Sequence, residues 1–445
     1  MISQMELIGN NKARFSELIS PAHFGLQSLS VPSPTVGVLP DAPHSLDLIE
    51  EIVKNKDKEQ DDGAFMLINL NTVLDRYELW KKELPMIEPF YAVKCNTDPV
   101  LVRTLAALDV GFDCASAEEI DIVMNMGVQP ERVIYANPCK TRSFISHAKD
   151  QNVKMMTFDN AEELKKIMTI HPNSEMILRI AVSDPTATCP LNLKFGCEPV
   201  KAAPKLLTIA RDMGVNVVGI SFHVGSGCND PTAYRVALEH CKRLHEMGIE
   251  LGFNMHIIDM GGGFPGDEHR PSFEEIASII RQSLEDLFPN NESIRWIAEP
   301  GRFFAALPFS LVANVIHSTE VPASKITKNS DDEDKPGFMY FLNDGVYGSF
   351  NCILFDHVHP VGRPLFDTSA EVFPTTIWGP TCDSLDMIED KKSMRHMEVG
   401  EWVLYEAMGA YTCAASTTFN GFARPTNIYV IGNDAWQIIN TSPHI

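Results

Sequence analysis

The residue of clearest chemical interest in this chain is Lys94, which follows the apolar run Phe90-Tyr91-Ala92-Val93. Apolar surroundings disfavour the ammonium form of a lysine, so a neutral, nucleophilic nitrogen becomes accessible near neutral pH. Such an amine condenses with a carbonyl group, and we therefore predict that Lys94 forms an imine with a carbonyl cofactor. Taken alone, a lysine at the end of a strand more often extends its amine into solvent. The other motifs of the chain favour the chemical interpretation.

Two glycine-rich segments each follow an apolar run. In the first, 223–227, Ser226 lies between glycines, so backbone N–H groups and a hydroxyl can converge on an anion. Alone, this segment is more often a plain tight turn, and His223 is either a packed core residue or a ring that stacks on an aromatic cofactor. The second, 261–266, matches the G-x-G-x-x-G pattern of dinucleotide-binding folds. It occurs late in the chain and the first strand–helix unit lacks it, so we interpret it as a loop that holds one terminal phosphate.

The segment Glu299-Pro300-Gly301-Arg302 follows a further apolar run. A carboxylate such as Glu299 can keep a pyridine nitrogen protonated, and an arginine such as Arg302 can bind a phosphate through two hydrogen bonds. An isolated Glu–Arg pair at a turn is more often structural.

Polar residues in the last third of the chain could bind and protonate a substrate. Asp356 and Asp383 could hold a distal ammonium group, and the neighbouring thiol of Cys382 could donate a proton. Tyr411 could offer its hydroxyl to a phosphate, although a core tyrosine is the usual alternative. Singly, the two aspartates and the cysteine are surface loop residues by default.

A pattern of strands and helices must position these residues. Short apolar runs alternate with helix-length amphipathic segments, which predicts βαβ units and a parallel sheet. Roughly eight such units in ~240 residues is the length of a (β/α)8 barrel, and the residues named above follow the strands, where barrel enzymes place their sites. The expected strands lie at 65–68, 89–93, 111–113, 133–135, 155–158, 177–180, 218–222, 256–259 and 296–299. The expected helices lie at 117–126, 161–170, 201–213, 233–247 and 272–287.

The chain of 445 residues is longer than a domain with a single hydrophobic core usually is, so two domains are expected. We predict an N-terminal extension with peripheral elements that pack with the β domain at 1–62, and the barrel at 63–305. A C-terminal β domain, either a sandwich or a β-barrel, is expected at 306–445. Its β-rich runs lie at 310–316, 337–342, 401–404 and 427–431.

The composition excludes several classes of function. Lys and Arg number 37 against 59 Asp and Glu, for a formal net charge of −22. This charge argues against a nucleic acid as partner and favours cationic ligands. No stretch predicts a membrane span, and the first residues lack the pattern of a secretory signal. The ten cysteines are too dilute for a disulfide scaffold and show no paired metal-ligand spacing, so we expect a cytoplasmic protein with reduced thiols and no metal.

Taken together, the motifs resemble eukaryotic ornithine decarboxylase from about residue 25 to Trp436, in the same order. The resemblance implies an enzyme dependent on pyridoxal 5'-phosphate, with an alanine-racemase-like barrel and a C-terminal β domain. It further implies a head-to-tail homodimer with shared sites, which converts L-ornithine into putrescine and CO2. The strings that carry the resemblance are 90–96, 112–116, 135–140, 223–227, 261–266, 299–302, 343–351, 378–383 and 409–411.

The same resemblance implies a role for each matched residue. Lys94 would form the imine, His223 would stack on the cofactor ring, and Glu299 would pair with the ring nitrogen. The residues expected to hold the phosphate are Ser226, Gly263, Gly301, Arg302 and Tyr411; the further cofactor-site residues are Gly262, Pro300, Asp113 and Arg179, with Glu119 also lining the pocket. The substrate's distal ammonium would be bound at Asp356, next to Phe355, and by Asp383 of the partner subunit, whose neighbour, the partner's Cys382, would protonate the intermediate.

Two alternatives stay open. A catalytically inactive relative that sequesters antizyme, as antizyme inhibitors do, generally loses several cofactor contacts, whereas this chain keeps those that the resemblance assigns. The other is a sister decarboxylase acting on lysine, arginine or diaminopimelate. Asp356 and Asp383 argue against diaminopimelate, whose distal end carries a carboxylate. Lysine is only one methylene longer than ornithine, which is worth about 1–3 kcal/mol of discrimination. The segment 125–155 resembles the region that binds antizyme, so antizyme is a further candidate partner.

Overall fold

The computed structural model describes residues 22–23, 35–182, 187–188, 194–267, 271–289, 293–366 and 371–444. The chain forms two compact units. The barrel unit consists of Asp75–Ala305 and Ser442–Ile445, and the sheet unit of Met1–Leu74 and Ala306–Thr441. Among the helices within the described residues, none combines the length and the apolar character that a membrane crossing requires.

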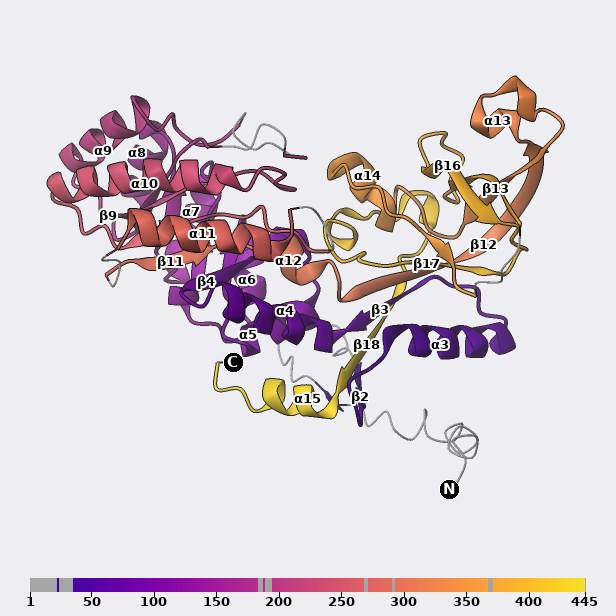
Figure 1. The fold of residues 1–445 in the computed structure, drawn as a ribbon. Coiled ribbons are helices and arrows are strands. Elements are labelled where there is room, and N and C mark those ends of the chain that lie inside the picture. The colour runs from indigo at the N-terminus through magenta and orange to yellow at the C-terminus, as the bar shows by residue number, and fades with distance from the viewer. Residues whose placement is uncertain are drawn as a thin grey trace. The chain divides into compact units, whose positions relative to one another are not determined.

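The barrel unit contains a closed barrel of eight parallel strands, as the alternating pattern predicts (Figure 1). Each strand pairs with the next one along the chain, and the last pairs with the first. The strands are β4 (Ile87–Ala92), β5 (Gly111–Cys114), β6 (Val133–Tyr135), β7 (Met155–Phe158), β8 (Glu175–Arg179), β9 (Val217–Ser221), β10 (Ile257–Asp259) and β11 (Arg295–Ala298).

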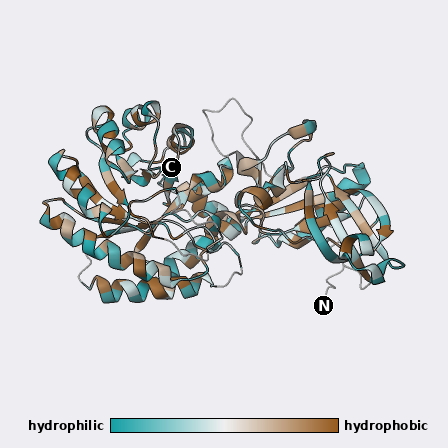
Figure 2. Cartoon of the chain, turned by 90° about the horizontal axis from the view of Figure 1, so that it is seen from above, coloured by the Kyte–Doolittle hydropathy of each residue, from teal (hydrophilic) through white to brown (hydrophobic). Residues whose placement is uncertain are grey.

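Helices follow the barrel strands, and several begin at side chains that cap their first turn. In Asp98, Ser116 and Ser272 an oxygen accepts a hydrogen bond from a backbone N–H two or three residues later, which satisfies a donor that a helix leaves free at its start. In Figure 2 these helices carry both hydrophobic and hydrophilic residues, as expected of helices with one face on a barrel. The helices are α4 (Leu70–Glu83, in this unit from Asp75), α5 (Pro99–Ala107), α6 (Ala117–Met124), α7 (Arg142–Asp150), α8 (Ala161–Ile170), α9 (Ala202–Asp212), α10 (Thr232–Glu250), α11 (Phe273–Leu287) and α12 (Arg302–Ala305).

The interior of the barrel changes from apolar to polar along the strands. Ile257 belongs to an apolar cluster that fills the barrel, and Asp259 points to the same face because side chains alternate along a strand. Asp259 pairs in register with Ser221 of β9, which pairs with Arg179 of β8. Polar side chains therefore form the last interior layer, at the carboxyl ends of the strands.

The sheet unit is built on a 10-stranded sheet. Its strands are β1 (Ala22–His23), β2 (Thr35–Leu39), β3 (Phe65–Asn69), β12 (Phe309–Pro322), β13 (Pro336–Leu342), β14 (Arg363–Pro364), β15 (Val372–Trp378), β16 (Met387–Arg395), β17 (Trp402–Tyr405) and β18 (Thr426–Gly432). Its helices are α3 (Ser45–Glu59), α13 (Ser324–Thr327), α14 (Cys352–Phe355) and α15 (Asn433–Asn440). The four β-rich runs expected after residue 306 are confirmed as β12, β13, β17 and β18.

One expected barrel strand lies elsewhere. The run 65–68 is strand β3, which pairs with β12 and β18 in the sheet. Every residue of β3 is buried, and α3 packs Ile49 and Val53 against it. A short, continuous apolar run predicts a buried strand but does not indicate which sheet the strand joins.

Candidate active site

Lys94 lies just beyond β4, in the short 3-10 turn Val93–Cys95. Its amine forms an ion pair and hydrogen bond with the carboxylate of Asp113, near the end of β5. The Lys94 side chain is 42% exposed and that of Asp113 is 1% exposed. The expectation that apolar surroundings act on this amine is therefore wrong. The amine is accessible from solvent, and its close contact is a buried carboxylate.

A cluster of buried acidic groups surrounds the polar end of the barrel: Asp113, Asp259 and Glu299 are 1%, 0% and 6% exposed. Burial, followed by the charge of Asp259, raises the pKa of Glu299 well above its ordinary value. Burial raises the pKa of Asp259 to about 6. Lys94 and Arg179 act in the opposite direction on Glu299. Three carboxyl groups thus face two cations, and an additional positive charge would stabilise their ionised form.

His223 directly follows Phe222, which hydrogen-bonds to β10 through its backbone. The N–H of Gly225 donates to Nδ1 of His223 at 3.0 Å, so that nitrogen carries no proton and the hydrogen of the neutral ring is on Nε2. Burial and the positive charges of Arg179 and Lys94 lower the pKa of His223 well below its usual value. The ring is therefore neutral at pH 7 and available for flat packing.

The glycine-rich loop after β10 is held close to this histidine. A Cβ on Gly262 would lie 2.8 Å from Nε2 of His223, and a Cβ on Gly263 would lie 2.8 Å from the hydroxyl of Tyr234. Gly263 also has a φ of +107°, which other residues rarely adopt. Only glycine lets the backbone of the loop approach so closely.

A hydroxyl and a guanidinium meet next to this loop. Nη2 of Arg302 donates to Oγ of Ser226 at 3.3 Å. Gly301 precedes Arg302, and a Cβ there would lie 3.0 Å from that of Cys95, beside Lys94. The pair Ser226 and Arg302, with the neighbouring glycine backbone, forms a donor set suited to a phosphate.

The barrel residues fit the cofactor that the motifs imply. An accessible lysine amine matches an aldehyde, the carboxyl cluster lacks the positive charge that a protonated pyridine would bring, and the serine–arginine pair matches a phosphate. Oδ1 of Asp113 and Oδ2 of Asp259 are also buried without a hydrogen-bond partner among the described atoms, as expected where a polar ligand belongs. Pro300 is buried between Glu299 and Gly301, and its carbonyl accepts from Ala92.

Glu119 and Arg179, the other expected pocket residues, are half-buried in the barrel unit. Oε2 of Glu119 accepts the N–H of Ala115 at 2.6 Å, while burial raises the pKa of this carboxyl. Arg179 ends β8 and acts electrostatically on His223, Asp259 and Glu299. The structure therefore brings these two residues to the same end of the barrel as Lys94.

The remaining expected site residues belong to the sheet unit. Cys382 is exposed and Asp383 is half-buried. The hydroxyl of Tyr347 hydrogen-bonds to Asp383, and Leu385 donates its N–H at 3.0 Å. These contacts, that of Tyr347 first, lower the pKa of Asp383. Asp383 is thus an anion ready to bind a cation.

Asp356 is 5% exposed and directly follows α14, whereas its neighbour Phe355 is 70% exposed. Tyr411 adopts a φ of +54°, a left-handed conformation that is uncommon outside glycine. Such local strain is frequent at functional positions.

Asp259 and Asp386 were not identified as site residues from the sequence. Asp259 ends β10, just before the glycine-rich segment 261–266, and Asp386 lies in the loop that follows the motif 378–383. Asp386 is 1% exposed and accepts hydrogen bonds from Val346 at 2.7 Å and from the N–H and hydroxyl of Thr381 at 2.9 and 2.7 Å. It fixes the loop that carries Cys382 and Asp383. An acidic residue three positions after Asp383 was the available signal.

Comparison with known proteins gives two family matches. The description "Pyridoxal-dependent decarboxylase, pyridoxal binding domain" matches residues 70–306, and "Pyridoxal-dependent decarboxylase, C-terminal sheet domain" matches residues 308–409. Together they cover most of the chain.

Individual relatives agree with the family matches. The chain is 62% identical over 446 residues to ornithine decarboxylase of Caenorhabditis elegans, with 100% of both chains covered. It is 45% identical over 398 residues to antizyme inhibitor 2 of Xenopus laevis, covering 88% of this chain and 86% of that one. Among solved structures, the arginine decarboxylase of Paramecium bursaria Chlorella virus bound to agmatine is similar with a TM-score of 0.80 at 35% identity, covering 87% of this chain and 100% of that chain.

Proposed function

The chain belongs to the pyridoxal-dependent decarboxylases, and on this premise we propose that it converts L-ornithine into putrescine and CO2. The observation that carries the proposal is the group of Lys94, Asp113 and Glu299 at the polar end of the barrel. The full-length similarity to a protein named ornithine decarboxylase supports ornithine as the substrate.

When bound, pyridoxal phosphate supplies a ring that accepts the electron pair released as the bond to the carboxylate breaks. Lys94 would hold its aldehyde carbon. Glu299 would keep the ring nitrogen protonated, because a buried carboxylate gains most from a cation at that position. His223, neutral at pH 7, would pack flat against the ring. Ser226, Arg302 and the adjoining glycine loop would bind the phosphate.

The orientation of the substrate follows from anchors at both ends. Holding the phosphate at one end and the distal ammonium at the other would fix the orientation of the carboxylate that leaves. Asp356, together with Asp383 of the partner subunit, would bind the distal ammonium of ornithine. Two acidic anchors also repel an amino acid with a distal carboxylate. Sγ of the partner's Cys382 would deliver the proton that replaces the carboxylate.

We also propose an oligomeric state, a protein partner and a location. A homodimer with composite sites would explain why Cys382 is exposed in a loop that hydrogen bonds to Asp386 hold in one conformation. Antizyme is proposed as a further partner because 125–155 resembles its binding region. The dilute cysteines of the sequence support a cytoplasmic location.

Release of CO2 tests this function directly. The purified chain with pyridoxal phosphate should release labelled CO2 from carboxyl-labelled L-ornithine and form putrescine. No release would refute the enzyme and favour a binding protein like antizyme inhibitors. Comparison of kcat/KM for ornithine and lysine tests the substrate, and a preference for lysine would contradict the assignment. Because the substrates differ by one methylene, a minor lysine activity agrees with the proposal.

A further inference from the structure

The proposed phosphate site depends on two segments that follow different strands. The glycine-rich loop follows β10, and the turn with Gly301 and Arg302 follows β11. Each must hold its backbone in a defined position if donors are to converge on one phosphate, because a misplacement of about 1 Å is already costly. Both segments are contacted by side chains of the same helix, α4.

Arg76 of α4 hydrogen-bonds to the backbone of both segments. Its Nη2 donates to the carbonyl oxygen of Pro265 at 3.2 Å, and its Nε donates to the carbonyl oxygen of Phe303 at 3.0 Å. The guanidinium carbon also lies 3.8 Å from the centre of the Phe303 ring, a favourable cation–π distance. Pro265 belongs to the glycine-rich loop and Phe303 directly follows Arg302, so one planar group joins the two.

Trp80, one helical turn after Arg76, packs against the same two segments. Its ring centre lies 4.9 Å from that of Phe264 and 5.3 Å from that of Phe303. Trp80 is fully buried, and its Nε1 donates to the carbonyl oxygen of Ile87 at 2.8 Å. Residues four positions apart share a face of a helix. The same face of α4 therefore contacts the two segments through polar and apolar groups.

The charge of Arg76 strengthens these hydrogen bonds. Burial lowers its pKa to about 10, while Glu274 and Asp267 act in the opposite direction. The guanidinium remains positive at pH 7, and a charged donor makes a stronger hydrogen bond to a carbonyl than a neutral one.

We propose that Arg76 is a positioning residue for the cofactor phosphate, because it ties the carbonyl of Pro265 to that of Phe303 and so sets the spacing between the glycine-rich loop and the Gly301–Arg302 turn. The inference rests on the proposed function, since it assumes that these segments hold a phosphate. Arg76 itself donates to backbone oxygens and takes no part in the reaction.

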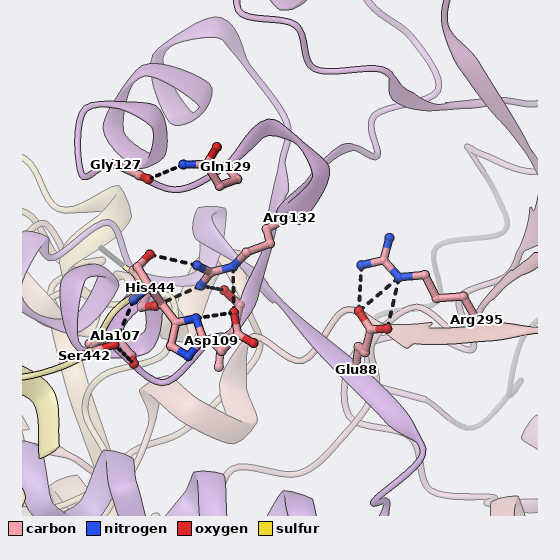
Figure 3. A network of polar contacts seen from close by, with 11 residues as sticks. Glu88, Ala107, Asp109, Gly127, Gln129, Arg132, Arg295, Ser442 and His444 are labelled. Atoms are coloured by element: carbon pink, nitrogen blue, oxygen red, sulfur yellow. Dashed lines mark hydrogen bonds and ion pairs between the residues drawn. The ribbon is translucent and has the colours of Figure 1, made fainter.

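Arg132 offers a matched control within the barrel unit. Its Nη2 donates to the carbonyl oxygens of Ala106 and Val110, both at 2.8 Å. Figure 3 shows its guanidinium beside Asp109 and His444. Like Arg76 it is half-buried and joins two backbone carbonyls, but the segments that it joins carry none of the proposed phosphate ligands.

The experiment compares Arg76→Met, Arg76→Lys and Arg132→Met with the unchanged holoenzyme. Release of pyridoxal phosphate is timed by absorbance after dilution, and the phosphorus NMR line of the bound phosphate reports how firmly it is held. Titrations with pyridoxal phosphate and with pyridoxal, which lacks the phosphate, give the two affinities. Thermal unfolding measures the loss of stability in each variant.

Arg76→Met should release pyridoxal phosphate roughly tenfold faster and narrow the phosphorus line, with little change in affinity for pyridoxal. Arg76→Lys keeps the charge but not the paired donors, so its rate of release should lie between those of Arg76→Met and the unchanged chain. If Arg76→Met does not fold, the comparison is made with Arg76→Lys. Arg132→Met should lose stability but retain the cofactor as the unchanged chain does.

Equal retention of pyridoxal phosphate in the Arg76 and Arg132 variants would overturn this inference alone. So would an equal loss of affinity for pyridoxal and for pyridoxal phosphate, because a general loosening of the barrel would then explain both. An unchanged chain that binds no pyridoxal phosphate would instead refute the proposed function, and the inference with it.

Discussion

The buried carboxyls of Asp113, Asp259 and Glu299 define the chemistry at the scale of single residues. Asp259 and Glu299 lie at the ends of the neighbouring strands β10 and β11, and Asp113 lies near the end of β5, where the interior of the barrel becomes polar. Asp113 holds the amine of Lys94 in an ion pair. Burial raises the pKa of both other carboxyls, and the charge of Asp259 raises that of Glu299 further, so a cation that enters this site gains a strong electrostatic interaction.

Replacement of Lys94 tests the covalent role of its amine. Lys94→Ala should abolish the visible absorption of bound cofactor and lower kcat by at least about a thousandfold, because it removes the amine proposed to hold the aldehyde. Borohydride reduction followed by peptide mapping should mark position 94 in the unchanged chain. Lys165→Ala, which removes a surface lysine paired with Glu162, should leave both properties intact. A reduced adduct on another lysine would contradict the assignment.

The pair formed by Asp259 and Glu299 predicts a pH dependence of stability. The pKa of Asp259 in the folded chain, about 6, lies above its ordinary value of 3.8, so the folded state binds this proton more tightly than the unfolded state. The proton bound at Asp259 therefore stabilises the folded chain below about pH 4, and this stabilisation is lost as pH rises from about 4 to about 6. In the cofactor-free chain, Asp259→Asn should reduce the loss of unfolding free energy over this pH range by about 3 kcal/mol.

Urea unfolding of the cofactor-free chain at several pH values between about 4 and 7 measures this difference. Asp390→Asn, at an exposed position of β16, should follow the unchanged chain throughout. If the free energy of unfolding changes with pH in the same way in Asp259→Asn and in the unchanged chain, the Asp259 carboxyl contributes nothing to the pH dependence.

At the scale of elements, the loop between β15 and β16 depends on one buried acid. Asp386 accepts three hydrogen bonds, from Val346 and Thr381. Its carboxylate would also lie 2.3 Å from a Cβ added to Gly345 or Gly379, so glycines at both positions leave it the space. The conformation of the loop therefore follows from a hydrogen-bond network that holds Cys382 and Asp383 in place.

Asp386→Asn should disturb this loop, because an amide nitrogen replaces one of the accepting oxygens. If Asp383 binds the substrate's ammonium, KM for ornithine should rise roughly tenfold, while the absorption of bound cofactor stays unchanged. Steady-state kinetics and spectra measure the two effects. A variant with an unchanged KM and reduced cofactor binding would contradict the separate roles proposed here, in which the loop between β15 and β16 serves the substrate and the glycine-rich loop serves the cofactor.

At the scale of the whole molecule, the proposed site residues belong to both units of the chain. The barrel unit carries the proposed cofactor ligands, apart from Tyr411, and the sheet unit carries Cys382 and Asp383. The net charge of −22 also favours the approach of a cationic substrate.

Complementation tests the composite site. Lys94→Ala and Cys382→Ala chains should each be nearly inactive alone. After mixing and exchange of subunits, about a quarter of the unchanged activity should return, since half of the dimers are mixed and each has one intact site. Tagged subunits establish that exchange has occurred. Full exchange without recovery would contradict sharing of sites between subunits.

The sequence by itself determined the barrel, the order of its strands and the motifs at their ends. Period-two and helical patterns are local, and parallel strands placed in chain order bring 94–96, 223–227, 261–266 and 299–302 to one end. Cofactor chemistry was likewise predictable, because it depends on residue types that immediately follow strands.

Only the tertiary structure decided which groups touch. The partner of Lys94 is Asp113, from a neighbouring strand; β3 joins the sheet; and Arg76 reaches across to Pro265 and Phe303. Each of these contacts joins segments that are separate in the chain, with no periodicity to mark the pairing. Side-chain reach and burial, which set such contacts and the pKa values that depend on them, arise only once the strands and helices have packed.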